Sequence, residues 1–217
     1  MDKILFVTRP SYDDGTEYLS EYASLVLKEA EKLGIDKKDF WGEKVNKKEV
    51  EKFIEIKNPK LLFINGHGDN DVLCGHKDEI IFSSNNNISL LKDRIIYARA
   101  CNAAVSLGKK ATEGAGGCFI GYKYPFSFWI DNKWSAKPLN DKTAALYLLP
   151  SNEVVISLLK GSSTQRAYEK SKTMMVENMK KILKMEEKKE PGAMGMMQVL
   201  WNNYDGQIIQ GNKEAHF

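Results

Sequence analysis

The sequence predicts an α/β fold, with a mostly parallel central sheet and helices on both of its faces in three layers. Short apolar runs typical of buried strands alternate along the chain with amphipathic segments of helical length. Two of these runs end on a reactive side chain, as strands do at the carboxyl edge of a parallel sheet. The length of 217 residues fits a single domain over 1–217.

The first third of the chain predicts a strand over residues 4–7 and a helix with Thr16 as its N-cap residue. The apolar side chains of this helix recur at the spacing of one helix face, and Gly34 ends it. A weak strand is expected near 40–45. Residues 46–57 repeat the helical pattern and stop at the Asn-Pro pair that follows.

The middle of the chain predicts three more strands and a small hairpin turned at His76-Lys77-Asp78. A helix of small residues is expected from Asn102 to about Thr112. The strands are expected at 61–65, 95–100 and 116–122, and the hairpin lies within 72–82.

The last third begins with an aromatic-rich stretch, 122–134, which predicts a long loop or an irregular edge strand. Helices are expected at 151–160 and 163–188. Residues 190–217 are interpreted as a terminal linker and an edge hairpin.

Composition narrows the classes of function. The 32 basic and 29 acidic side chains give a net charge of +3 with both signs interspersed, which favours neither nucleic acid nor a membrane as partner. No apolar stretch approaches the roughly 20 residues of a membrane span, and the start does not resemble a signal peptide. The irregular spacing of Cys74, Cys101 and Cys118 fits a reducing compartment, so a cytoplasmic location is expected.

The strongest functional signal is a histidine and a cysteine at two strand ends. His67 follows the 61–65 strand and Cys101 follows the 95–100 strand. If the strands are neighbours, a thiol lies beside an imidazole, which is the pairing of a cysteine nucleophile with its base. A glycine N–H beside His67 and the Cys101 N–H can hold a developing oxyanion, and a helix starting after Cys101 would favour the thiolate.

Alternation along the 95–100 strand places Arg99 on the same face as Cys101. A guanidinium recognises carboxylates in a fixed two-pronged geometry. One hypothesis is therefore a preference for Asp or Glu at the P1 position of a substrate. The other is an internal ion pair with Asp69 or Asp71.

The His-Gly and Ala-Cys strand ends resemble the caspase-like (clan CD) cysteine peptidases, most closely the CHAT and gingipain-like domains. Cys101 follows His67 by 34 residues, fewer than the roughly 50 of caspases. The resemblance implies a caspase-like fold and a thiol protease that needs no cofactor or metal. It makes Cys101 the nucleophile, His67 the acid–base group, and the N–H groups of Gly68 and Cys101 the oxyanion hole.

Arg99, Trp129 and Asp69 complete the predicted site as substrate-binding residues, for a peptide or protein substrate. A regulatory protein is a second expected partner. Three alternatives stay open at this stage: a catalytically silent scaffold of the same fold, a flavodoxin-like small-molecule binder, and a zinc site that joins Cys74 and His76 to the His67 and Cys101 pair.

Overall fold

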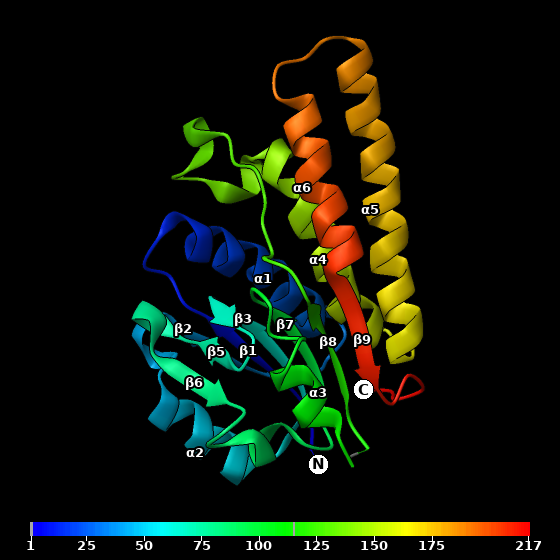
Figure 1. The fold of residues 1–217 in the computed structure, drawn as a ribbon. Helices are drawn as coiled ribbons and strands as arrows, with labels where there is room; N and C mark the ends of the chain where they lie inside the picture. Colours follow the sequence, from blue (N-terminus) through cyan, green and yellow to red (C-terminus); the bar gives the residue numbers. More distant parts are fainter. Residues whose placement is uncertain (1, 115) are drawn as a thin grey trace.

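A six-stranded sheet forms the centre of the computed structural model, which describes residues 2–114 and 116–217 (Figure 1). The strand order is β2-β1-β3-β7-β8-β9. The first five strands run parallel, and β9 is antiparallel to β8. The strands are β1 (Asp2–Arg9), β2 (Asp36–Trp41), β3 (Pro59–Asn65), β7 (Ile95–Arg99), β8 (Cys118–Tyr122) and β9 (Gln207–Gly211).

Helices cover both faces of this sheet, because alternate strand residues are apolar on each side. Phe63 and Tyr97 belong to the core under α1 (Asp14–Lys32), α4 (Lys142–Leu159) and the start of α5 (Thr164–Glu187). Leu62 and Ile96 belong to the opposite core, under α2 (Lys47–Lys57) and α3 (Leu107–Thr112). The predicted three-layer α/β fold is confirmed.

A third apolar cluster joins α4 and α5 to α6 (Ala193–Gly206). In Figure 1, α5 and α6 extend well beyond the sheet. The chain then enters β9, which forms the edge of the sheet opposite to β2.

A small antiparallel sheet lies between β3 and β7 in the chain. It consists of β4 (Gly68–Asp69), β5 (Val72–Cys74) and β6 (Ile80–Ser83). The turn between β5 and β6 is at His76–Asp78, which is the predicted hairpin turn. Leu73 and Phe82 pack into the core on the α2 side.

Several predicted elements need correction. Asp13, not Thr16, is the N-cap residue of α1, and β2 lies at Asp36–Trp41 rather than near 40–45. The helix expected from Asn102 begins only at Leu107. The segment interpreted as a linker and hairpin instead forms α6 and the single edge strand β9.

The helix expected at 151–160 begins much earlier, at Lys142, and contains Pro150. Proline cannot donate the backbone hydrogen bond to the residue four positions before it. That free acceptor is the carbonyl of Leu146, and the Asn178 amide of α5 donates to it at 2.7 Å. A side chain from another helix thus replaces the missing bond.

Among the described residues, no helix is both long and apolar enough to cross a lipid bilayer.

Candidate active site

The candidate site lies at the carboxyl edge of the sheet, where β3 and β7 end side by side. Asn65 pairs with Arg99 in the parallel ladder, so the chain leaves both strands at the same level. Two residues further on are His67 and Cys101. A Cβ at Gly68 would lie 3.0 Å from the Ala100 Cβ, so the segment after His67 packs against the segment that leads to Cys101.

Gly66 makes the turn that brings His67 to this edge. Its φ of +144° is a backbone conformation that other residues rarely adopt. A Cβ there would lie 2.6 Å from the Cys74 carbonyl oxygen and 3.2 Å from Pro10 Cγ. The turn therefore requires glycine.

His67 is held by a carboxylate from the loop after β1. Its Nε2 lies 2.8 Å from Asp13 Oδ2. Both side chains are partly open to solvent, with 49% and 39% of their surfaces exposed. An imidazole bonded to a carboxylate through one ring nitrogen keeps the other nitrogen, here Nδ1, for proton exchange. Sequence analysis did not assign Asp13 to the site.

Asp13 is itself fixed, because it is the N-cap residue of α1. Its Oδ1 accepts hydrogen bonds from the Thr16 N–H at 2.7 Å and from the Thr16 hydroxyl at 2.9 Å. The Asp13 N–H donates in return to the Thr16 hydroxyl oxygen, which completes a capping box. Partial burial raises the pKa of Asp13, but the hydrogen bonds from Thr16 and His67 lower it by more. The net result is a pKa below the ordinary value, which favours the ionised carboxylate.

The Cys101 thiol is half-buried beneath the loop that follows β8. Its Sγ lies 3.9 Å from the carbonyl oxygen of Phe126. Within the described parts of the chain, the thiol makes no hydrogen bond with the His67 ring. Burial raises the pKa of the thiol, a backbone contact with Phe126 lowers it, and the charge of Asp69 raises it. The net pKa is above the ordinary value, so the resting cysteine is a thiol rather than a thiolate.

The backbone after Cys101 is a series of turns, which corrects the expected support from a helix dipole. Asn102 has a φ of +55°, and α3 starts only at Leu107. The Ala104 N–H donates to the Tyr122 carbonyl at 3.1 Å, which ties the segment to the end of β8. The positive end of a helix therefore does not lie next to the sulfur.

Two backbone N–H groups are available as oxyanion donors. The Cys74 N–H donates to the His67 carbonyl, so the next pair in this antiparallel ladder, Gly68 and Leu73, is of the non-hydrogen-bonded kind. The Gly68 N–H consequently points away from β5. Across residues 2–114 and 116–217, the Cys101 N–H donates to no backbone or side-chain acceptor.

Arg99 is not placed to bind a substrate, and the acidic P1 hypothesis based on it is therefore corrected. The side chain is fully buried, on the face of the sheet that α1 and α4 cover. Its four hydrogen bonds go to Asn65 Oδ1, Ser151 Oγ, Asn152 Oδ1 and the Leu19 carbonyl, at 2.7 to 3.1 Å. The internal ion pair with Asp69 or Asp71 is also wrong, because all four acceptors are uncharged. Burial without a counter-ion lowers the pKa of Arg99 to about 10.

Asp69 is exposed at the rim, one residue after Gly68. Its Oδ1 accepts from the Asn70 N–H at 2.8 Å and from the Asn102 amide at 3.4 Å. The contact with Asn102 links Asp69 to the residue after Cys101, and the charge of Asp69 contributes to the raised pKa of the Cys101 thiol. Asp69 thus stays a candidate for contact with substrate.

Trp129 lies in the loop that passes Cys101, but its ring rests on α6. A Cβ at Gly195 would lie 2.8 Å from Trp129 Cζ2, so the ring packs directly on the backbone of the helix at this glycine. Asn203 of α6 also holds this loop, through hydrogen bonds to the backbone N–H and carbonyl of Ser127. The contacts of Trp129 therefore position the loop, and 39% of the side chain remains exposed.

The zinc alternative finds no support. Within the described residues, no group of three or more His, Cys, Asp and Glu side chains is arranged to hold a metal ion. Cys74 and Cys118 are buried, and burial raises the pKa of each to about 11. Both behave as core residues.

Comparison with known proteins identifies similar solved structures only. No protein-family model matches the sequence, and no curated protein matches it. The crystal structure of the Arg-specific cysteine proteinase gingipain R (RgpB) superposes with a TM-score of 0.55 at 14% identity, over 98% of this chain and 46% of that chain. A complex of Porphyromonas gingivalis RgpB pro- and mature domains gives the same TM-score and identity, over 98% and 47%.

These similarities show the fold. The chain has an α/β fold similar to that of gingipain R, and it spans about half the length of the gingipain chains. These two structures are gingipains, so they bear on the gingipain-like part of the predicted resemblance and not on the CHAT domains.

Replacing Arg99 with Met tests its structural role. We expect the free energy of unfolding to fall by at least about 3 kcal/mol, because several buried acceptors lose their donor together. Urea unfolding followed by circular dichroism measures the change. Arg166→Met, on the outer part of α5, is the matched control and should lie within about 0.5 kcal/mol of the parent. Equal stabilities for the two variants would contradict the assigned role.

Replacing Asp69 with Asn tests the electrostatics of the thiol. Because the Asp69 charge raises the pKa of Cys101, its removal should lower that pKa. The pH dependence of the rate of Cys101 alkylation by iodoacetamide should shift to lower pH. Asp71→Asn, in the same turn region, is the control and should leave the profile in place. An unchanged or upward shift for Asp69→Asn would disprove the effect.

Proposed function

We propose that this protein is a cysteine endopeptidase with Cys101 as nucleophile and His67 as acid–base group. The observation that carries the proposal is the Asp13 and His67 pair beside the strand end that holds Cys101. A carboxylate, an imidazole and a thiol from three separate segments converge at the functional edge of the sheet. The fold shared with a cysteine proteinase supports the same function.

The reaction follows from the roles of these groups. The thiol transfers its proton to His67 as the sulfur attacks the carbonyl carbon of the peptide, and the oxyanion that forms accepts hydrogen bonds from the Gly68 and Cys101 N–H groups. His67 then donates the proton to the leaving amine, and a thioester remains on Cys101. Water, deprotonated by His67, attacks the thioester, releases the carboxylic acid and restores the thiol.

The raised pKa of Cys101 determines how the thiol is activated. A thiolate is not favoured in the resting protein, so a base must remove the proton as substrate binds. Asp13 suits this mechanism, because its carboxylate stabilises the positive charge that His67 acquires. In proteins of this kind, catalytic hydrogen bonds often close only when substrate is bound.

The charges at the rim favour a basic P1 residue. With Arg99 buried, the charged side chain that acts on the thiol is Asp69, and a carboxylate attracts a P1 Arg or Lys and repels a P1 Asp or Glu. Gingipain R is described as Arg specific, which agrees with this choice.

Hydrolysis by single variants tests the catalytic assignment. Cys101→Ala and His67→Ala should abolish cleavage of a fluorogenic peptide, and Asp13→Asn should lower kcat by at least about 100-fold, because the imidazolium loses its counter-charge. Cys118→Ala, His76→Ala and Asp14→Asn are the matched controls and should retain activity. Hydrolysis that survives in Cys101→Ala would refute the dyad, and a parent protein inactive on every peptide would favour the silent scaffold.

A panel of peptide coumarin amides tests the P1 preference. Substrates with Arg or Lys at P1 should exceed those with Asp or Glu by at least about tenfold in kcat/KM, the effect of roughly 1.4 kcal/mol of differential attraction. Asp69→Asn should reduce this ratio, because any change in the Cys101 pKa affects both substrate classes alike and cancels in the ratio. Faster cleavage after acidic residues would rule out the assignment.

A further inference from the structure

The edge strand β2 has an open side away from the candidate active site. It pairs with β1 on one side, and no strand of residues 2–114 and 116–217 pairs with it on the other. An unpaired edge presents backbone N–H and C=O groups to a further strand. Any ligand at this edge therefore has main-chain partners available.

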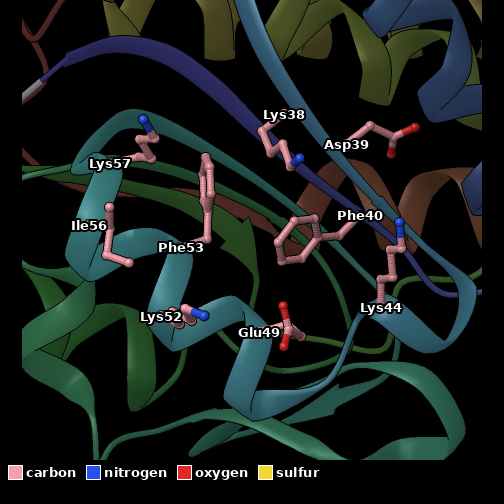
Figure 2. Close-up of a pocket in the computed structure, with 9 residues that line it drawn as sticks. All are labelled: Lys38, Asp39, Phe40, Lys44, Glu49, Lys52, Phe53, Ile56 and Lys57. Atoms are coloured by element: carbon pink, nitrogen blue, oxygen red, sulfur yellow. The ribbon is translucent and has the colours of Figure 1, made fainter.

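An apolar groove of about 390 Å³ lies beside this edge, between β2 and α2 (Figure 2). The rings of Phe40 and Phe53 are 5.6 Å apart, and Phe53 stacks on Phe6 at 4.9 Å, so the floor continues into the core. Ile56 lines the same groove and has 65% of its surface exposed. The volume and the aromatic floor are those of a binding site for side chains.

Lysines surround this apolar floor. Lys38 and Lys44 line the β2 side, and Lys52 and Lys57 come from α2. In the described structure, none of the four forms a salt bridge. Glu49 is the one free carboxylate of the lining, because Asp39 is already bound by the Arg9 guanidinium at 2.9 and 2.7 Å. The groove thus combines an apolar floor with an excess of unpaired positive charge.

We propose that the groove and the β2 edge together bind an extended acidic segment of a partner protein, which adds to the sheet as a further strand. Alternate side chains of a strand point to the same face. Those on the α2 side would enter the groove, where apolar groups contact Phe53 and Ile56 and carboxylates meet the lysines. On the opposite face, Trp41 is 58% exposed at the end of β2 and offers a second apolar contact.

The lysines around the groove favour an acidic strand over other partners. Lysines on an edge strand oppose pairing with basic strands. They attract a strand that carries carboxylates, and main-chain pairing gives affinity while the groove gives specificity. The β2 strand of a second copy carries two Asp and two Lys and is net neutral, so an acidic segment matches the unpaired lysines of the groove better.

The binding test uses the Cys101→Ala protein, so that its outcome is independent of peptidase activity. The probe is a fluorescein-labelled and amidated peptide of two Glu-Thr-Val-Thr repeats, in which Glu and Val lie on the same face of a strand, followed by fluorescence anisotropy. We expect saturable binding, and none for the matching peptide with Lys in place of Glu. Lys52→Glu together with Lys57→Glu should weaken binding at least about tenfold. The control pair Lys28→Glu and Lys48→Glu makes the same change in net charge outside the groove and should leave binding within about twofold.

Two further probes test strand pairing itself. Methylation of one alternate set of peptide nitrogens should abolish binding, and methylation of the other set should not, because only one set faces β2. Equal effects of the two sets would overturn strand addition. Equal weakening by the control pair, or displacement of the peptide by inorganic phosphate or ATP at similar concentration, would overturn the proposed acidic-strand site.

Discussion

The carboxyl edge of the sheet depends on the buried guanidinium of Arg99. It contacts the end of β3 through Asn65, α1 through the Leu19 carbonyl, and α4 through Ser151 and Asn152. Asn65 in turn exchanges hydrogen bonds with Thr8 at the end of β1. Arg99 therefore fixes the ends of β3 and β7 relative to two helices, and Asn65 extends this network to the end of β1. The charge of Arg99 is spread over uncharged acceptors, which is a costly arrangement unless every donor is satisfied.

This anchor explains how loops can hold a well-defined site. The chain travels only two residues from Asn65 to His67 and two from Arg99 to Cys101, so neither side chain has far to move. The other parts of the site are held independently of Arg99. Asp13 is fixed as the N-cap residue of α1, and the loop over Cys101 is fixed by its hydrogen bonds to Asn203 of α6. The candidate site is thus an assembly of helix and strand ends.

Local periodicity predicted β1, β3, β7 and β8, helices α1, α2 and α5, and the two reactive strand ends, because those signals lie within a few neighbouring residues. The start of α4 could not be predicted in this way, since Pro150 is tolerated only through the distant Asn178. The partner of His67 lies 54 residues away in sequence. The alternation along β7 predicted that Arg99 shares a face with Cys101. It could not predict that α1 and α4 bury this side chain, because those helices are distant in sequence, and burial gives Arg99 a structural role in place of substrate binding.

The capping box at the start of α1 has a consequence for behaviour in acid. The pKa of Asp13 is lower in the folded protein than in the unfolded chain, so its contribution to stability is present above the unfolded pKa and is lost as the pH falls through the folded one. The same carboxylate caps the helix and holds the imidazole. Protonation of Asp13 would therefore loosen the first turn of α1 and release His67 at the same time. The order of this helix end and the catalytic state of the histidine would change over the same pH range.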